Sequence, residues 1–171
     1  SGLLPIVLGV FIVFWQANRS LELEARHTAD EAVRQFDLML DNAALAADVV
    51  LPLAGQHCPQ VELALREQVT RRPFVRSVNL VWNDQIYCTS LFGDFKETVN
   101  PGNYVNGTLW LMKGNPITPD EPLLVYRRED GRRSVLVSLY GFHLVNVLGL
   151  INAKTQLLIQ VGDTWIDRYG Q

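Results

Sequence analysis

The residues with the most distinctive chemistry in this 171-residue chain are its two cysteines. Cys58 lies in the stretch GQHCPQVELAL, and Cys88 follows thirty residues later in IYCTSLFGD. Two such thiols can fill a hydrophobic core, form a structural disulfide, or form a disulfide that redox partners open and close. Pro59 is typical of the first turn of a helix, so we expect Cys58 at or next to a helix N-terminus. The helix dipole favours the thiolate there and raises its reactivity.

No other group of residues predicts catalysis. His27, His57 and His143 are scattered, and no pair has the i, i+4 spacing typical of metal ligands on a helix. His57 and its neighbouring cysteine could form half of a zinc site, with the second cysteine and an unidentified carboxylate as the remaining ligands. Ser90 lies outside any G-x-S-x-G sequence, which excludes a nucleophile elbow. We therefore expect no catalytic residue, no metal site and no cofactor in this chain.

The charge of the chain limits the partners that it could bind. Lys and Arg total 15 and Asp and Glu total 18, which leaves a net charge of −3. A nucleic-acid-binding domain needs a clustered basic face, so we expect no nucleic-acid partner. Four arginines bracket a hairpin signal: Arg127, Arg128, Arg132 and Arg133. We predict that they form a solvated edge, and an anion-binding role for one of them is the alternative.

The first apolar segment is typical of a helix that enters a membrane. The residues from Leu3 to Trp15 carry no charge, but a membrane-spanning helix needs about 20 such residues. The chain opens with Ser1 rather than Met, so we expect the native protein to extend further upstream. Trp15 stands where an aromatic side chain would meet the membrane surface. We therefore predict that residues 1–15 are the outer part of a transmembrane helix, and a buried N-terminal core helix is the alternative.

A long helix with a heptad pattern follows this segment. Small and apolar residues recur at alternating spacings of four and three, at Ala25, Ala29, Ala32, Phe36, Met39, Ala43, Ala46 and Val50. Such a repeat predicts a seam along one helix face, and a helix from Leu3 to Val50 would be about 70 Å long. We expect two copies to pair as a parallel homodimer with Phe36 and Met39 at this seam. The alternative is a helix that lies across its own domain, and both can hold in different parts of it.

The remainder of the chain predicts an α+β domain. Pro59 begins a short helix that Pro73 ends. Strand patterns with turn signals between them follow at residues 74–82, 86–90, 108–113, 123–128, 134–139 and 155–161, with a further short helix at about 142–152. The expected fold is therefore a long N-terminal helix that emerges from a membrane, plus an antiparallel sheet of the PAS or Cache type with short helices.

The two cysteines and the stretches YCTSLFG and YVNGTLWLMKGNPITPDEPLLVYR resemble the CSS-motif periplasmic sensory domain. This family is found in bacterial membrane proteins upstream of an EAL-type cyclic di-GMP phosphodiesterase domain. Cys58 and Cys88 match the family's two cysteines, and Ser90 matches the last serine of its motif. Thr89 stands where the middle serine would be, a departure that keeps a hydroxyl group.

The resemblance implies where this domain lies and which part of the parent protein is the enzyme. Residues 16–171 would be the periplasmic sensory domain of a protein in the bacterial inner membrane. A second membrane helix and the phosphodiesterase domain, with its divalent metal, are not in this chain. The fragment itself is therefore not expected to be an enzyme, whereas the parent protein would be a phosphodiesterase.

The resemblance also implies a Cys58–Cys88 disulfide that acts as a redox switch. In the oxidised state, the bridge would tie the hairpin to the membrane-proximal helices and keep the phosphodiesterase inactive. Reduced, it would free the helices to arrange an active dimer. The expected partners are a second copy of the chain, the membrane, and periplasmic thiol–disulfide oxidoreductases. A purely structural bridge and two unpaired core thiols stay open as alternatives.

Two other classes of function also fit the sequence. One is a small-ligand sensor of the PAS or Cache type, with a pocket drawn from Trp82, Trp110, Tyr126 and nearby strand residues. The other is a structural module of a membrane complex. The sequence leaves the choice among these classes open.

Overall fold

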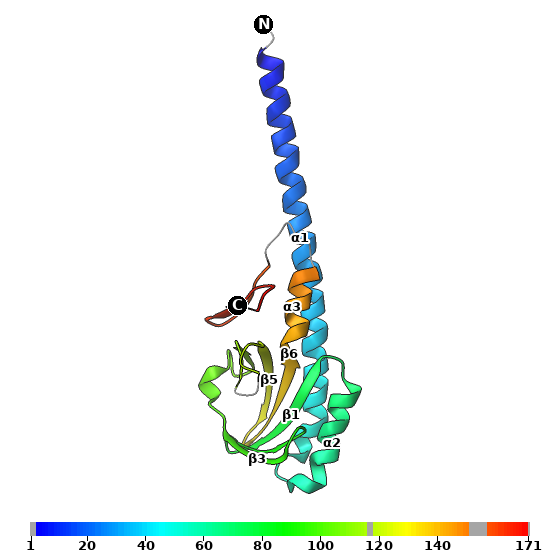
Figure 1. The fold of residues 1–171 in the computed structure, drawn as a ribbon, viewed down its shortest axis with the longest axis vertical. Coiled ribbons are helices and arrows are strands. Elements are labelled where there is room, and N and C mark those ends of the chain that lie inside the picture. The colour runs from blue at the N-terminus through cyan, green and yellow to red at the C-terminus, as the bar shows by residue number, and fades with distance from the viewer. Residues whose placement is uncertain (1–2, 116–117, 151–156, 171) are drawn as a thin grey trace.

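A long helix and a six-stranded sheet form the framework of the protein (Figure 1). The computed structural model describes residues 3–115, 118–150 and 157–170. The long helix α1 (Leu3–Val50) leads through a 3-10 helix, η1 (Leu51–Leu53), into the short helix α2 (Cys58–Arg71). The α+β class and both predicted helices are confirmed.

The sheet is antiparallel, and its strands lie in the order β3-β2-β1-β6-β5-β4. Their bounds are β1 (Val75–Trp82), β2 (Gln85–Thr89), β3 (Gly93–Thr98), β4 (Leu109–Met112), β5 (Leu123–Asp130) and β6 (Arg133–Tyr140). A 3-10 helix, η2 (Pro101–Asn103), lies between β3 and β4, and α3 (Gly141–Leu150) follows β6. A small hairpin of β7 (Ile159–Val161) and β8 (Thr164–Ile166) comes last.

The predicted strands are present, but the sequence patterns do not predict β3 and β8. All residues of β3 after Gly93 are exposed, so this edge strand lacks the apolar alternation that identifies a strand in a sequence. The strand predicted at 155–161 is described only as β7, because residues 155 and 156 lie outside the described part of the chain. The same holds for residues 151 and 152 at the end of the last predicted helix.

The hairpin of β1 and β2 is closed by a tight turn at Asn83 and Asp84. Their φ angles are 50° and 58°, and Trp82 pairs with Gln85 on either side of them. Two left-handed residues in a two-residue loop are typical of a type I′ turn, which Asn and Asp tolerate better than most residues. A β-bulge between Leu80 and Val81 then shifts the pairing by one residue, so that Cys88 rather than Tyr87 lies opposite Leu80 on β1.

The two faces of the sheet differ in what covers them. We call the face against which α1 and α2 pack the helix face, and Val78, Leu80 and Val137 are fully buried there. The other face, here the open face, carries a smaller apolar cluster that includes Val81 and Leu136. Figure 1 shows α1, α2 and α3 together on one side of the sheet, so the helices cover one face only.

The heptad seam of α1 packs on the helix face. Met39 is 1% exposed and belongs to the main hydrophobic core, and Phe36 is half-buried against the same core. The prediction that Met39 lies at a seam between two copies is therefore wrong, because its side chain is already covered by its own domain. The alternative of a helix lying across its own domain is what the structure has in this part of α1. An ion pair between Asp48 and Arg128, 3.2 Å apart, also joins the end of α1 to β5.

The N-terminal part of α1 extends beyond the domain (Figure 1). All side chains from Ile6 to Glu24 are exposed, and those from Ile6 to Trp15 include no charged residue. Within the described residues, none of the helices is long and apolar enough to cross a membrane.

Candidate functional site

The two cysteines form a disulfide that joins β2 to the first residue of α2. The Cα atoms of Cys58 and Cys88 are 5.2 Å apart, within the usual range for such a bridge. Both residues are buried, with exposed fractions of 3% and 0%. The predicted pairing is therefore present, and the alternative of two unpaired thiols is excluded.

A second contact links β2 to the turn that precedes α2. The Tyr87 hydroxyl accepts a hydrogen bond from the Gly55 backbone N–H at 2.8 Å. Burial raises the pKa of Tyr87, and the Gly55 hydrogen bond works in the opposite direction. Gly55 has a φ angle of 102°, and a Cβ atom there would lie 3.0 Å from the Trp82 ring, so this position requires glycine. The sheet thus holds the α1–α2 connection at Gly55 as well as at Cys58.

The two hydroxyl residues after Cys88 hold the end of β2 in place. Ser90 Oγ accepts a hydrogen bond from the Val78 N–H at 3.0 Å, and the Ser90 N–H donates to the Val78 carbonyl at 2.9 Å. The Thr89 hydroxyl accepts a hydrogen bond from the Phe92 N–H at 2.9 Å and so closes the turn toward β3. The sequence motif pointed to thiol chemistry, but it did not reveal these backbone contacts. A hydroxyl residue directly after a strand is the signal that could have suggested them.

A further contact joins the motif to α2. The Arg66 side chain donates to the Ser90 carbonyl at 3.2 Å and is ion-paired with Glu62 one helical turn earlier. The hairpin is therefore fastened to α2 at two heights, by a covalent bond at Cys58 and by a hydrogen bond at Arg66. Opening the disulfide leaves the second fastening in place.

The position of Cys58 gives the bridge distinct chemical properties. Cys58 is the first residue of α2, where the helix dipole stabilises a thiolate leaving group. Its burial keeps an external thiol away, so exchange requires the first turn of α2 to open. Closing a loop of about 31 residues restricts the unfolded chain by about 3–4 kcal/mol in the entropic model. The bridge thus stabilises the fold by restricting the unfolded chain, and its Cys58 sulfur is a good leaving group in thiol–disulfide exchange.

The half-zinc site considered for His57 is not formed. Both cysteines are consumed by the disulfide, and His57 is an exposed residue just before α2. Among the described residues, no group of three or more His, Cys, Asp or Glu side chains could hold a metal ion.

The arginine cluster is only partly a solvated edge. Arg128 and Arg132 are exposed as predicted, and Arg133 is ion-paired with Asp130. Arg127 is 4% exposed, so the prediction is wrong for this residue. Its guanidinium group contacts Glu129 at 2.7 Å, Asp84 at 3.8 Å and the Gly107 carbonyl at 3.3 Å. These partners neutralise Arg127 and give it a role in holding the loop before β4.

The three residues predicted to line a ligand pocket do not come together. Trp110 lines a concave pocket of about 560 Å³ on the open face. Trp82 instead lies against Gly55 on the helix face, and Tyr126 packs against the main core. The prediction is wrong for these two because the position of each residue within its own strand sets its face, and Trp82 and Tyr126 take the face opposite to that of Trp110.

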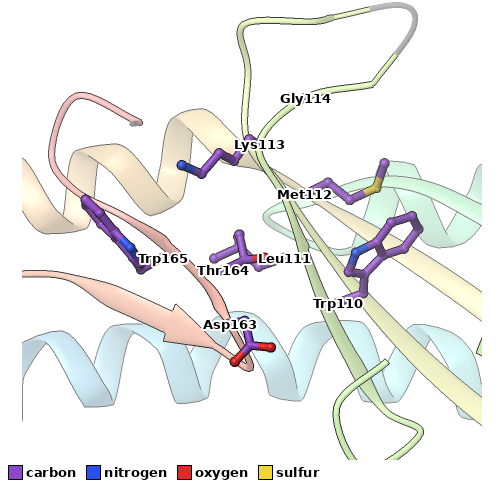
Figure 2. Close-up of a pocket in the computed structure, with 8 residues that line it drawn as sticks. All are labelled: Trp110, Leu111, Met112, Lys113, Gly114, Asp163, Thr164 and Trp165. Atoms are coloured by element: carbon purple, nitrogen blue, oxygen red, sulfur yellow. The ribbon is translucent and has the colours of Figure 1, made fainter. Parts of the chain in front are cut away.

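A smaller and more open cleft of about 350 Å³ lies where β4 meets β8. Figure 2 shows Lys113 and Trp165 on one side of β4, with Trp110 and Met112 on the other. The Lys113 ammonium group lies 5.4 Å from the centre of the Trp165 ring. This cation–π contact holds the C-terminal hairpin against the sheet edge.

Comparison with known proteins identifies related sequences. A family model described as "CSS motif domain associated with EAL" matches residues 21–171. "Probable cyclic di-GMP phosphodiesterase PdeD" of Escherichia coli (strain K12) is 38% identical over 65 residues, which cover 38% of this chain and 12% of that protein. "Probable cyclic di-GMP phosphodiesterase PdeG" of the same organism is 22% identical over 179 residues, which cover 96% of this chain and 32% of that protein. The chain spans about a third or less of the length of these curated relatives.

Proposed function

The chain belongs to the family of CSS-motif domains associated with EAL, and from this membership we propose that it is the redox-sensing regulatory domain of a membrane-bound cyclic di-GMP phosphodiesterase. The names of both relatives support the phosphodiesterase assignment for the parent protein. The fragment would contribute regulation, and the hydrolysis would belong to an EAL domain.

The observation that carries the proposal is the position of the disulfide. Cys58 lies eight residues after the end of α1, and the bridge fixes this connection to the sheet. The last turns of α1 are fully buried on the same face, at Ala46, Ala47 and Val50. A change at the bridge therefore acts on the base of one rigid helix.

The switching reaction is a thiol–disulfide exchange. A thiolate of a reduced dithiol protein attacks the Cys88 sulfur and forms a mixed disulfide, and the S–S electrons leave with Cys58 as a thiolate. The second thiol of the partner then releases Cys88, so the bridge gains two electrons and the partner becomes oxidised. A periplasmic thiol–disulfide oxidoreductase is the class of partner that supplies this dithiol. The helix N-terminus stabilises the departing Cys58 thiolate.

We place the domain in the periplasm and its N-terminal helix in the inner membrane. The exposed apolar side chains from Ile6 to Trp15 support this location, because water is an unfavourable environment for such a surface. The Arg19 guanidinium lies 5.3 Å from the Trp15 ring, the kind of pair expected at a membrane surface. In this proposal the oxidised bridge keeps the phosphodiesterase inactive. Its reduction lets α1 pair with a second copy and activates the phosphodiesterase.

The test uses the full-length protein in membranes. Phosphodiesterase activity is measured in a series of glutathione buffers, and the bridge is followed in parallel by thiol labelling. Activity of the wild-type protein should rise as the bridge opens, and Cys58→Ser and Cys88→Ser should both be constantly active. Thr70→Ala, which removes a hydroxyl from the far end of α2 and keeps the bridge, is the matched control and should respond like the wild type. Equal activity of the wild-type and Cys→Ser proteins in all buffers would make the bridge purely structural.

A further inference from the structure

The pocket on the open face has the size and the walls of a small-molecule site. Its volume of about 560 Å³ lies within the range of about 300–1,000 Å³ that is usual for such sites. Aromatic rings from separate segments of the chain line it, among them Phe92, Tyr104 and Trp110. Tyr104 and Trp110 are in edge contact at 5.6 Å between ring centres, so one wall is preformed.

A pair of exposed phenylalanines also lines the pocket. Phe92 is 56% exposed and Phe95 is 37% exposed, and their rings stack at 5.7 Å. Both come from the hairpin of β2 and β3, which is fastened to α2 by the disulfide and by Arg66. Aromatic surface that is stacked at the rim of a cavity and left in water gains from a ligand that covers it.

The floor of the pocket carries polar groups in the middle of the sheet. Ser77 and Ser138 are cross-strand partners on β1 and β6, and Asn79 follows on the same face. Ser77 is 5% exposed. Within the described residues, none of these three side chains makes a hydrogen bond to the protein, and none of their polar atoms is among those sealed from solvent without a partner. Polar groups that face a cavity and have no protein partner are free to form a hydrogen bond with a molecule bound there.

The charge around the pocket narrows the class of ligand. Among the residues that line it, Glu97 is the charged one, and it is exposed on the edge strand β3. Arg127, on the same face, is already neutralised by Glu129 and Asp84. Among the described residues, an anionic ligand would therefore find no unneutralised cation at the floor, whereas a neutral ligand would meet apolar walls and hydrogen-bonding groups.

We propose that the open-face pocket binds a small, neutral, mostly apolar molecule with a ring between Phe92 and Trp110 and one polar group on Ser77, Asn79 and Ser138. The site lies on the face of the sheet opposite the disulfide. The ligand proposal does not depend on the proposed redox function, because neither cysteine lines the pocket.

The test uses a matched pair of fluorescent probes on the oxidised protein. N-phenyl-1-naphthylamine is neutral and apolar and has one N–H group, and 1-anilinonaphthalene-8-sulfonate has the same ring system with an added negative charge. The neutral probe should bind saturably with one site per chain, and the sulfonate should bind at least about tenfold more weakly. A preference for the sulfonate would overturn the assigned ligand class.

Two variants locate the site. Phe92→Ala should weaken binding of the neutral probe by about tenfold, because it removes one aromatic wall. Phe142→Ala is the matched control, since Phe142 is similarly exposed at 59% but lies on α3 outside the pocket. Ser138→Phe should abolish binding by filling the floor, with circular dichroism and thiol labelling as checks of the fold and the bridge.

The comparison between variants also separates the pocket from the apolar N-terminal segment, which could adsorb the same probe. Binding that is weakened by Phe92→Ala and unchanged by Phe142→Ala supports the site even if Ser138→Phe does not fold. Absence of saturable binding, or an equal response to both phenylalanine variants, would overturn the proposal.

Discussion

The two faces of the sheet are built from the same strands but have opposite properties. On the helix face, Val78 and Leu80 of β1 are fully buried beneath α1 and α2, and the disulfide is sealed beside them. On the open face, the alternate residues Ser77 and Asn79 of the same strand face a pocket. One face is suited to transmit strain to a helix, and the other is suited to receive a molecule.

The helix face therefore contributes mainly to stability, and the open face of the same sheet is the one that could recognise a ligand. Side chains in a sealed core contribute most when they are apolar and tightly packed, because any void left in it stays empty. A face that keeps a wet concavity tolerates changes of volume and can hold polar groups. If the two faces differ in this way, changes on the helix face should cost more stability than changes on the open face.

Loss of the disulfide should produce the largest change. The double variant Cys58→Ser, Cys88→Ser should lower the free energy of unfolding by about 3–4 kcal/mol, because the unfolded chain regains the entropy of the open loop. Urea denaturation without reductant measures this difference. In the presence of reductant, the wild-type protein should lose a similar amount. A loss below about 1 kcal/mol would mean that packing alone secures the helix face.

Truncation of a leucine should cost more on the helix face than on the open face. Leu80→Ala should lower the free energy of unfolding by about 3 kcal/mol, because Leu80 is fully buried and leaves a sealed cavity. Leu136→Ala should cost about 2 kcal/mol, because Leu136 lines the pocket and its loss only enlarges a cavity that water already reaches. Denaturation of the two variants under the same conditions gives the comparison, and equal losses would contradict the distinction between the faces.

Alkaline pH should destabilise the open face through Tyr104. Burial raises the pKa of Tyr104 from 10.0 to about 12, with the nearby Glu97 carboxylate adding to the effect and Arg127 opposing it. Between these values the unfolded chain has released this proton while the folded chain keeps it. Stability is therefore complete below pH 10 and falls by about 2 kcal/mol as the pH approaches 12.

The variant Tyr104→Phe isolates that contribution. It cannot ionise, so its free energy of unfolding should fall less steeply between pH 10 and pH 12 than that of the wild type. Denaturation curves at a series of pH values compare the two proteins. The same slope for both would contradict the assignment of this pH dependence to Tyr104.

The smallest effects should come from two buried serines on β1 and at the end of β2. Ser90→Ala should cost about 1–2 kcal/mol, because the buried Val78 N–H loses its acceptor. Ser77→Ala should change stability by less than about 0.5 kcal/mol, because its hydroxyl makes no hydrogen bond to the described residues. Thermal denaturation resolves the two, and a larger loss for Ser77→Ala would contradict its assignment to the ligand.

The parts of the fold that follow local rules could be predicted from the sequence. The long helix and the helix start at Pro59 depend on spacing and on proline geometry, and the strands β1 and β2 are two strand patterns with a turn signal between them. The strand β3 could not be predicted, because an exposed edge strand has no apolar pattern. Its existence depends on pairing with β2, which is a contact outside its own sequence.

The candidate site divides in the same way. The identity of the two cysteines and the helix-start position of Cys58 could be read directly. Only the structure shows that the bridge is buried. It also shows the hydrogen bonds from Val78 to Ser90 and from Arg66 to Ser90. Trp110 was correctly placed in a pocket, whereas Trp82 and Tyr126 were not, because a list of aromatic residues does not say which face each one occupies.

The sequence alone was enough to identify the helices, six of the eight strands in the described part of the chain, the pair of cysteines and the heptad repeat of α1. It could not decide what covers that repeat, because an apolar seam packs equally well against a second helix or a sheet. In the folded chain α1 packs against the sheet, and Met39, Ala43 and Ala46 are buried in the core between them. The tertiary structure likewise decided that Cys58 and Cys88 lie on the sealed face and Ser77 on the open one. The physical reason is that a side chain is buried by another element that packs against it, and the sequence of one element does not say which element that is.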